Sequence, residues 1–443
     1  MKKRVTRAAM IIALMIAAAA NGAGFDMYEM SNEIWRWSAP ASYPPPWFEG
    51  MKMETLSVIL DSGNLQWYEP RPEKDTWDAV VGGKVHAPML TVWKVLTDYE
   101  SQCRIMSKTF TSCQTEWRSG DKVKNNYRIK ITVLEFATEF DMIDLVKEYA
   151  PSRQRISTIE GGLKGRELDI ILVPVDDGRN TLYFMRYHAH MKSLGLSMQA
   201  VLALVPMAEW PVTAASANYH MSSHKKEAER LAGYTPPAKP APLAYESLDV
   251  DTLRALGRVN AGLIRETPEG KTISGLAFAF INAPPDLVWD LVQDLEHYND
   301  FFHDQDTTVE KRQGNKVWVS QDTKSQSVLV FTFGYQMRSL YTLDPPRHLS
   351  YRAYEGSYEG SFSEVYILPI NGGKQCVLFC EIGLNFDRDT ALTARIIRSG
   401  DFPFNTVMDL LAVRAVLNNL KPEAEKRAAA GKASGGQGVS GED

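Results

Sequence analysis

Four histidines in the first half of the chain have spacings that suit metal binding. His188 and His190 alternate along a strand-like stretch, so their imidazoles face the same side, and His220 and His224 are four residues apart on a predicted helix. If this strand and this helix are neighbours, the ring nitrogens could converge on one metal ion. The alternative is that His220 and His224 are solvated near the end of their helix. We favour this alternative and predict neither a metal ion nor a cofactor.

A second kind of chemistry would use charged side chains. Glu160 and Glu355 each precede a glycine in a predicted turn, where a carboxylate could polarise a ligand or could instead accept hydrogen bonds from turn amides. Arg186 and Glu381 lie on strand-like runs; facing inward, each would be a buried charge that awaits a ligand or a partner. Facing outward, each would be exposed on the outer side of its sheet. With His188, these four residues are our candidate ligand-binding side chains, and no catalytic residue is predicted.

The segment from Leu194 to Trp210 is nearly free of charge, with Glu209 as its one charged residue. Pro206 and a length below 18 residues argue against a membrane-spanning helix. One interpretation is a buried helix. The other is an apolar gate over a cavity, or a patch that contacts a membrane transiently to exchange a lipid. Val201 and Leu204 would then contact the ligand or the lipid.

Composition and motifs exclude several classes of function. The 443 residues carry a net charge of −5, which argues against nucleic-acid binding because that usually needs a basic face. The sequence contains no nucleophile elbow, zinc-protease helix, P-loop, dinucleotide fingerprint or paired CxxC motif. These absences leave open a reaction that uses scattered residues in a cavity.

The N-terminus has the layout of a secretory signal. Basic residues at positions 2–7 precede an apolar run over 8–20, and small residues follow near position 23. We therefore expect a signal peptide over residues 1–23 and a periplasmic or extracellular protein, with an uncleaved membrane anchor as the alternative. Export would permit a disulfide between Cys103 and Cys113. Cys376 and Cys380 lie in a strand-like run, about 13 Å apart at the rise of a strand, so they are expected to be buried thiols.

Two halves of the chain repeat one pattern. Ala87-Pro88 followed by Trp93 recurs as Ala283-Pro284 followed by Trp289, a shift of 196 residues. Further on, Pro151, Glu160-Gly161, Gly165 and Pro174 recur with a shift of 195 residues as Pro346, Glu355-Gly356, Gly360 and Pro369. The chain is therefore expected to hold two copies of one domain.

Each copy predicts the same order of elements. A strand ends at Ala-Pro, where the proline should begin a helix, and the two tryptophans of this helix are expected in the core. Several antiparallel strands then follow between turn signals, and one long helix closes the copy.

This order, the Ala-Pro-x4-Trp helix start and the Glu-Gly-x3-Gly turn resemble the START-like (SRPBCC) superfamily, which includes polyketide cyclases and coenzyme Q-binding proteins. The resemblance implies an α+β fold with two tandem helix-grip domains, each a curved antiparallel sheet wrapped around its long C-terminal helix. It also implies an apolar cavity that holds a lipid, a quinone or a sterol-like or polycyclic molecule.

The sequence then divides into six segments. After the signal peptide, an aromatic and proline-rich segment over 24–76 is expected to pack on the first domain, which spans 77–232. A proline-rich spacer and short helix over 233–265 lead to the second domain over 266–421, and the tail over 422–443 is expected to be disordered. The predicted function is an exported carrier for a hydrophobic small molecule. The alternatives are a cyclase or aromatase-type enzyme, and a scaffold whose cavities have collapsed.

Overall fold

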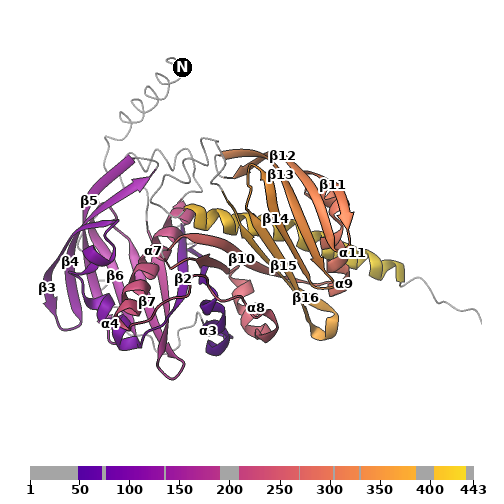
Figure 1. Cartoon of the computed structure of the whole chain (residues 1–443). Coiled ribbons are helices and arrows are strands. Elements are labelled where there is room, and N and C mark those ends of the chain that lie inside the picture. The colour runs from indigo at the N-terminus through magenta and orange to yellow at the C-terminus, as the bar shows by residue number, and fades with distance from the viewer. Residues whose placement is uncertain are drawn as a thin grey trace, which may run out of the picture. The chain divides into compact units, whose positions relative to one another are not determined.

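The structure is a computed structural model that describes residues 48–71, 76–133, 136–189, 209–268, 270–302, 305–328, 331–385 and 404–435. The described residues form two units (Figure 1). Unit 1 comprises residues 69–235, and unit 2 comprises 48–68 together with those from 236 onward. Each unit is described by itself below.

Unit 1 is an antiparallel sheet with one long helix. It begins with β2 (Thr76–Val85), α4 (Met89–Thr97) and α5 (Gln102–Ile105). Six strands follow in sequence: β3 (Phe110–Ser119), β4 (Lys122–Val133), β5 (Phe136–Tyr149), β6 (Arg153–Gly161), β7 (Glu167–Val175) and β8 (Asn180–His188). The strand order is β2-β8-β7-β6-β5-β4-β3. The closing helix α7 (Glu209–Leu231) packs on β2 and β8.

Unit 2 repeats this order after a short entry. The entry comprises α3 (Met53–Asp61), β1 (Asn64–Arg71, in this unit as far as Tyr68), α8 (Val250–Arg258) and β9 (Gly262–Glu266). The repeated part comprises β10 (Thr272–Ile281), α9 (Pro285–Gln293), the 3-10 helix η6 (Leu295–Asp300), β11 (Gln305–Gln313), β12 (Lys316–Val328), β13 (Phe331–Asp344), β14 (His348–Gly356), β15 (Phe362–Ile370), β16 (Gln375–Gly383) and α11 (Phe404–Gly435). The strand order is β11-β12-β13-β14-β15-β16-β10-β9-β1, and α11 packs on β10 and β16.

The predicted repeat is confirmed down to the register of the strands. The pairing of β5 with β6 shifts between Ile143 and Asp144, and that of β13 with β14 shifts at the matching place between Arg338 and Ser339. Each predicted proline also stands where expected, because Pro88 and Pro284 are the N-cap residues of α4 and α9. The equivalence between the two units can therefore be followed residue by residue.

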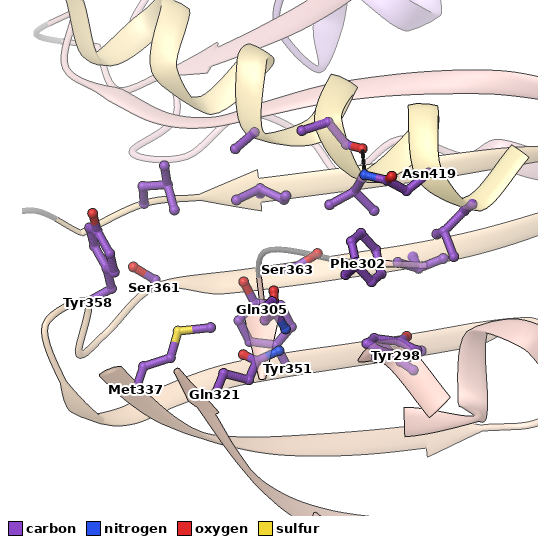
Figure 2. A pocket seen from close by; sticks show the side chains of 18 of the residues that line it. Tyr298, Phe302, Gln305, Gln321, Met337, Tyr351, Tyr358, Ser361, Ser363 and Asn419 are labelled. Carbon is purple, nitrogen blue, oxygen red and sulfur yellow. Dashed lines mark hydrogen bonds between the residues drawn. The ribbon is translucent and has the colours of Figure 1, made fainter. Parts of the chain in front are cut away.

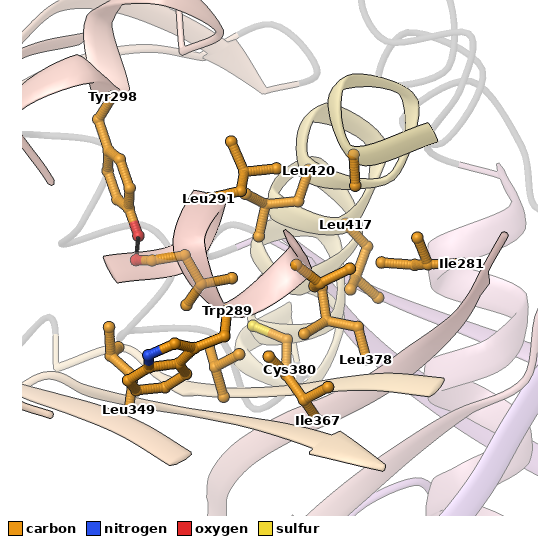
Figure 3. Close-up of a cluster of buried hydrophobic side chains, with 14 of the residues drawn as sticks. Ile281, Trp289, Leu291, Tyr298, Leu349, Ile367, Leu378, Cys380, Leu417 and Leu420 are labelled. Carbon is orange, nitrogen blue, oxygen red and sulfur yellow. Dashed lines mark hydrogen bonds between the residues drawn. The ribbon is translucent and has the colours of Figure 1, made fainter. Parts of the chain in front are cut away.

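The core of unit 2 lies between α9, α11 and the sheet (Figure 3). Trp289 is 5% exposed and packs in this core, as predicted, whereas Trp93 in unit 1 is half-buried. Gly275 on β10 allows the close approach of α11, because a Cβ there would lie 2.7 Å from the Leu410 backbone nitrogen. The long helix is thus held against one face of its sheet.

The N-terminal segment corrects one prediction. Its described part as far as Tyr68 belongs to unit 2, whereas we predicted packing on the first domain. Asn64 on β1 pairs with Ile264 on β9, and the Lys52 amide donates a hydrogen bond to Thr252 Oγ1 over 2.9 Å. The physical reason is that β9 extends the sheet of unit 2 and offers backbone groups that β1 satisfies.

The proline-rich linker is more than a spacer. Tyr245 stacks on Tyr366 of β15 with 4.6 Å between ring centroids, and Arg265 Nη2 donates to the carbonyl of Ala241 over 3.1 Å. The short helix that follows begins at Val250, where the Asp249 carboxylate caps the Thr252 amide. The linker therefore packs on the sheet of unit 2 along part of its length.

The C-terminal tail is also more ordered than predicted. Helix α11 continues through Pro422 to Gly435, and Ala424 and Ala428 are buried in the core of unit 2. These alanines are four residues apart, so they share the face that packs on the sheet. Proline costs this helix one backbone hydrogen bond, but the packing beyond it keeps the helix intact.

The cysteines follow the predicted pairs. Cys103 and Cys113 form a disulfide that joins α5 to β3. Cys376 and Cys380 are free and buried, and burial raises the pKa of each thiol to about 12. The second pair is therefore inert core, as expected.

Candidate functional site

Unit 2 contains a cavity of about 210 Å³ between the sheet and α11 (Figure 2). Five aromatic side chains line it. The aromatic residues are Tyr298, Phe302, Tyr341, Tyr351 and Tyr358. Further lining residues are Val292, Met337, Leu349, Val365, Ile382, Leu384, Leu411, Ala412, Ala415, Val416, Leu420, Gln305, Gln321, Ser361, Ser363 and Asn419.

The lining is apolar and uncharged. Within the described residues, no aspartate, glutamate, lysine, arginine, histidine or cysteine lines the cavity. Its titratable side chains are tyrosines, and burial raises the pKa of Tyr298 above its usual value. The described lining therefore offers no counter-charge to an ionic ligand.

Most polar groups of the lining are already satisfied by the protein. The Tyr298 hydroxyl donates to the Val292 carbonyl over 2.6 Å, and Ser361 Oγ accepts a hydrogen bond from the Asn385 amide over 2.7 Å. Gln321 is the exception: its Nε2 donates to the Tyr341 hydroxyl over 3.1 Å, but its buried Oε1 has no partner. Among the buried polar side-chain atoms of the described lining, Gln321 Oε1 is the one that accepts no hydrogen bond.

Small side chains at three equivalent positions distinguish unit 2 from unit 1. Unit 2 has Ser339, Ala353 and Ser361 where the matched register of unit 1 has Asp144, Thr158 and Arg166. In unit 1, Arg166 Nη2 donates to Asp144 Oδ2 over 2.6 Å and its Nε donates to Thr158 Oγ1 over 3.0 Å, with both charged side chains at most 3% exposed. In unit 1, bulky hydrogen-bonded side chains thus occupy the positions at which unit 2 has small side chains.

The histidines of α7 belong to this polar interior of unit 1. His224 Nε2 lies 2.8 Å from Gln102 Oε1, and its Nδ1 lies 3.2 Å from the Tyr183 hydroxyl. His220 is 8% exposed, so the prediction that these two histidines are solvated is wrong. Burial lowers the pKa of His224 to about 4 and lowers that of His220 as well, so both rings are neutral at pH 7.

The alternative in which the four histidines converge on a metal ion requires His188 to face α7. Tyr183 of β8 faces α7, and His188 lies at odd spacing from it, so His188 points away from the helix. Its Nδ1 is 3.0 Å from Asp78 Oδ1 on β2. Over the part of the chain that the structure describes, no three potential ligands gather into a metal site, and His190 lies outside that part.

Arg186 and Glu381 both lie on the sheet face opposite the long helix. Arg186 Nε donates to Asp78 Oδ2 over 2.5 Å. Glu381 is 3% exposed and pairs with Arg265 Nη1 at 2.8 Å, while its neighbours Cys380 and Ile382 face the core. Glu381 does not line the cavity of unit 2, and the charge of each residue is paired locally. The ligand-binding role of the two residues stays a prediction.

The glutamates of the two turns are exposed. Glu355 is 60% exposed and pairs with Arg338, and Glu160 is exposed in unit 1. The glycine after Glu160 has φ +91°, and a Cβ there would lie 1.8 Å from the Asp141 carbonyl oxygen, so the conserved feature of the repeat is the shape of the turn. Neither glutamate lines the cavity of unit 2.

The predicted apolar gate falls outside the described residues, which omit 190–208 and therefore Val201 and Leu204. The gate and its transient membrane contact stay predictions. Among the helices that the structure describes, none is long and apolar enough to cross a membrane.

The residues that line the cavity were not predicted from the sequence. They are ordinary core types, and only their three-dimensional arrangement leaves space between them. One difference between the two copies could have indicated the cavity. The repeat aligns Asp144 and Arg166 of unit 1 with Ser339 and Ser361 of unit 2, so unit 2 lacks the charged pair.

Among known proteins, similarity was found only to solved structures. Neither the family models nor the curated protein sequences gave a match. The di-domain ARO/CYC StfQ from the steffimycin biosynthetic pathway is similar over 79% of this chain and 99% of its own, with 12% identity and a TM-score of 0.29.

Two single-domain structures are similar over shorter stretches. The Zhui aromatase/cyclase from Streptomyces sp. R1128 covers 35% of this chain and 94% of its own, with 20% identity and a TM-score of 0.28. A START superfamily protein from Mycobacterium smegmatis covers 35% and 98%, with 14% identity and a TM-score of 0.27. At these scores the fold assignment rests on the strand order and register of this chain.

Proposed function

We propose that the protein is an exported carrier that binds a neutral hydrophobic small molecule in the cavity of unit 2. The observation that carries this proposal is the cavity itself, about 210 Å³ in volume and lined by uncharged side chains. Burial of apolar ligand surface there supplies the driving force for binding. Export is supported by the basic and apolar N-terminus of the sequence.

The size of the cavity limits the ligand. An apolar cavity of about 150 Å³ in another protein holds a benzene molecule. The cavity of unit 2, at about 210 Å³, therefore suits a compact ring system, such as two fused rings or the head of a quinone. A larger lipid would place only part of its structure inside.

The chemistry of the lining favours binding over catalysis. A cyclase-type reaction needs groups that donate and accept protons near neutral pH. Tyrosines, serines and amides are poor general bases at neutral pH, and they are the polar side chains that the described lining offers. The same lining holds an uncharged ligand without reacting with it.

The test uses the neutral two-ring fluorophore 1-naphthylamine, whose emission shifts to shorter wavelength when it leaves water. Wild-type protein should bind about one equivalent. Ala412→Phe adds a ring to the cavity wall and should abolish binding, whereas Ala429→Phe, on an exposed position of the same helix, should bind normally. Equal binding by all three proteins would contradict the proposal, since the probe would then sit elsewhere.

A cyclase-type activity is the second candidate, and the polar interior of unit 1 favours it. Arg166 hydrogen-bonds Tyr187, and the neutral His220 lies 6.0 Å from the same tyrosine ring. Arg166 and the Tyr187 hydroxyl would supply hydrogen bonds to the carbonyl oxygens of an acyl chain. Turnover of a poly-β-keto thioester by wild-type protein that is lost in Tyr187→Phe would establish this function. If wild-type protein shows no turnover, the cyclase function is contradicted and the carrier function is the one that stands.

A further inference from the structure

We propose that Ser361 and Ser363, at the start of β15, set the size of the ring system that unit 2 accepts. Their small side chains leave room for the second ring of a ligand with two fused rings. This inference rests on the proposed function, because it assigns a specificity-determining role to two residues of the same cavity. It selects a two-ring molecule over its one-ring analogue.

The first step is the position of the two serines. Both line the cavity, and both are at most 3% exposed (Figure 2). They are two residues apart in extended backbone, so their side chains point to the same face of the sheet. Glu364, which follows Ser363, points to the opposite face, where its side chain is 50% exposed. The start of β15 therefore presents two small side chains to the cavity.

The second step identifies the equivalent residues of unit 1. The pairing of β15 with β16 repeats the pairing of β7 with β8, with each residue 195 positions later in the sequence. On this register, Ser363 corresponds to Leu168, and Ser361 corresponds to Arg166. The two units therefore differ in side-chain size at two neighbouring positions of one sheet face.

The third step is the space that these side chains take in unit 1. Arg166 reaches across the sheet to Asp144 on β5, with 2.6 Å from its Nη2 to the Asp144 Oδ2, and Arg166 and Leu168 are each 2% exposed. A serine side chain ends at its first oxygen and does not reach this far. A small side chain in place of a large one leaves a cavity unless its surroundings close over it. The cavity beside the two serines shows that the surroundings in unit 2 stay open.

The fourth step is that the serine hydroxyls have partners within the protein. Ser361 Oγ accepts a hydrogen bond from the Asn385 amide over 2.7 Å, and Ser363 Oγ lies 3.9 Å from Cys380 Sγ. The role that we assign to the serines therefore depends on their small size and requires no hydrogen bond to the ligand. A variant that removes the hydroxyl and stays small should behave like wild-type protein.

The experiment titrates the protein with 1-naphthylamine, which has two rings, and with aniline, which has one, by isothermal titration calorimetry. Wild-type protein should bind 1-naphthylamine more tightly by about tenfold, because the second ring buries additional apolar surface. Ser363→Leu places the side chain of unit 1 in the cavity wall. It should weaken 1-naphthylamine binding by about tenfold, because its added methyl groups take space from the second ring, and aniline binding by less than about threefold.

Two further variants are matched controls. Ser363→Ala removes the hydroxyl without adding bulk, and Glu364→Leu adds the same leucine on the exposed face of the same strand. Both should bind 1-naphthylamine as wild-type protein does. Circular dichroism checks that each variant is folded, and Ser363→Val replaces the leucine variant if that one does not fold.

The outcomes separate the two proposals. Failure of wild-type protein to bind 1-naphthylamine would contradict the carrier function itself, and this inference with it. Three results would overturn the inference alone: unchanged 1-naphthylamine binding by the bulky variant at position 363, an equal loss of both probes in that variant, or a loss of binding in Ser363→Ala. In each of them wild-type protein still binds the probe, so the carrier function stands.

Discussion

At three equivalent positions the two units carry side chains of very different size and charge. In unit 1, Asp144 and Arg166 form a buried ion pair; in unit 2, serines stand at both places. Removing one member of a buried pair leaves an uncompensated charge, whereas removing both leaves none. The pair should therefore behave as one element of the core of unit 1.

This predicts strong coupling in a double-mutant cycle. Arg166→Ser and Asp144→Ser should each lower the free energy of unfolding by about 3–5 kcal/mol. The double variant, which places the residues of unit 2 in unit 1, should lose clearly less than the sum of the two. Urea unfolding of the four proteins measures this, and additive losses would show that the two side chains do not interact.

A second prediction at this scale concerns His224. Its pKa is lowered by burial to about 4 in the folded protein, so between pH 4 and 6.5 the unfolded state binds more protons. Stability should therefore fall as the pH falls through this window, by up to about 3 kcal/mol from this residue.

The measurement is urea unfolding at pH 7.5, 6 and 5 on wild-type protein and on His224→Leu, which carries an apolar residue in place of the imidazole. The variant should show a smaller loss of stability on acidification. An unchanged pH dependence would mean that the imidazole is not buried in its neutral form.

Among the elements, α11 departs most from what the sequence suggested. A proline at 422 and the alanine-, lysine- and glutamate-rich stretch after it are typical of a helix end and a frayed tail. The structure instead buries Ala424 and Ala428, and Glu425 Oε1 accepts a hydrogen bond from the Asn282 amide over 3.0 Å. Glu229 makes the matching bond to the His86 amide in unit 1, so the contact belongs to the repeated fold.

Truncation tests this reading of α11. A chain that ends after Lys421 should lose about 2 kcal/mol of stability, because it loses two buried alanines and one hydrogen bond. A chain that ends after Gly435 keeps these contacts and should unfold like the full protein. Thermal unfolding compares the three chains. If the chain that ends after Lys421 were as stable as the full chain, the helix beyond Pro422 would not contribute to the core.

The repeat made the helices and strands predictable. It did not make predictable which residues surround an individual charged side chain. The Ala-Pro helix starts and the glycine turns fix local backbone geometry, so their sequence spacing transferred directly to both units. The face on which Arg186 or Glu381 lies depends on strand register, and their partners Asp78 and Arg265 are distant in the sequence. A single sequence does not contain that information.

For the whole molecule, the sequence predicted two copies of one domain but not a difference between their interiors. Our sequence hypothesis looked for function in the first copy, at the apolar segment over 194–210. The cavity described here lies in unit 2, and its uncharged lining became recognisable only when the side chains were placed in space. Tandem copies let one unit keep a buried ion pair while the other keeps small uncharged side chains at the same positions.

The central claim is that unit 2 carries a neutral hydrophobic molecule, and organic extraction of purified protein followed by mass spectrometry tests it most directly. Wild-type protein and Ala429→Phe should each release a neutral, ring-containing molecule in nearly equimolar amount, and Ala412→Phe should release almost none. An empty extract from wild-type protein, or the same molecule in the same amount from Ala412→Phe, would contradict the account.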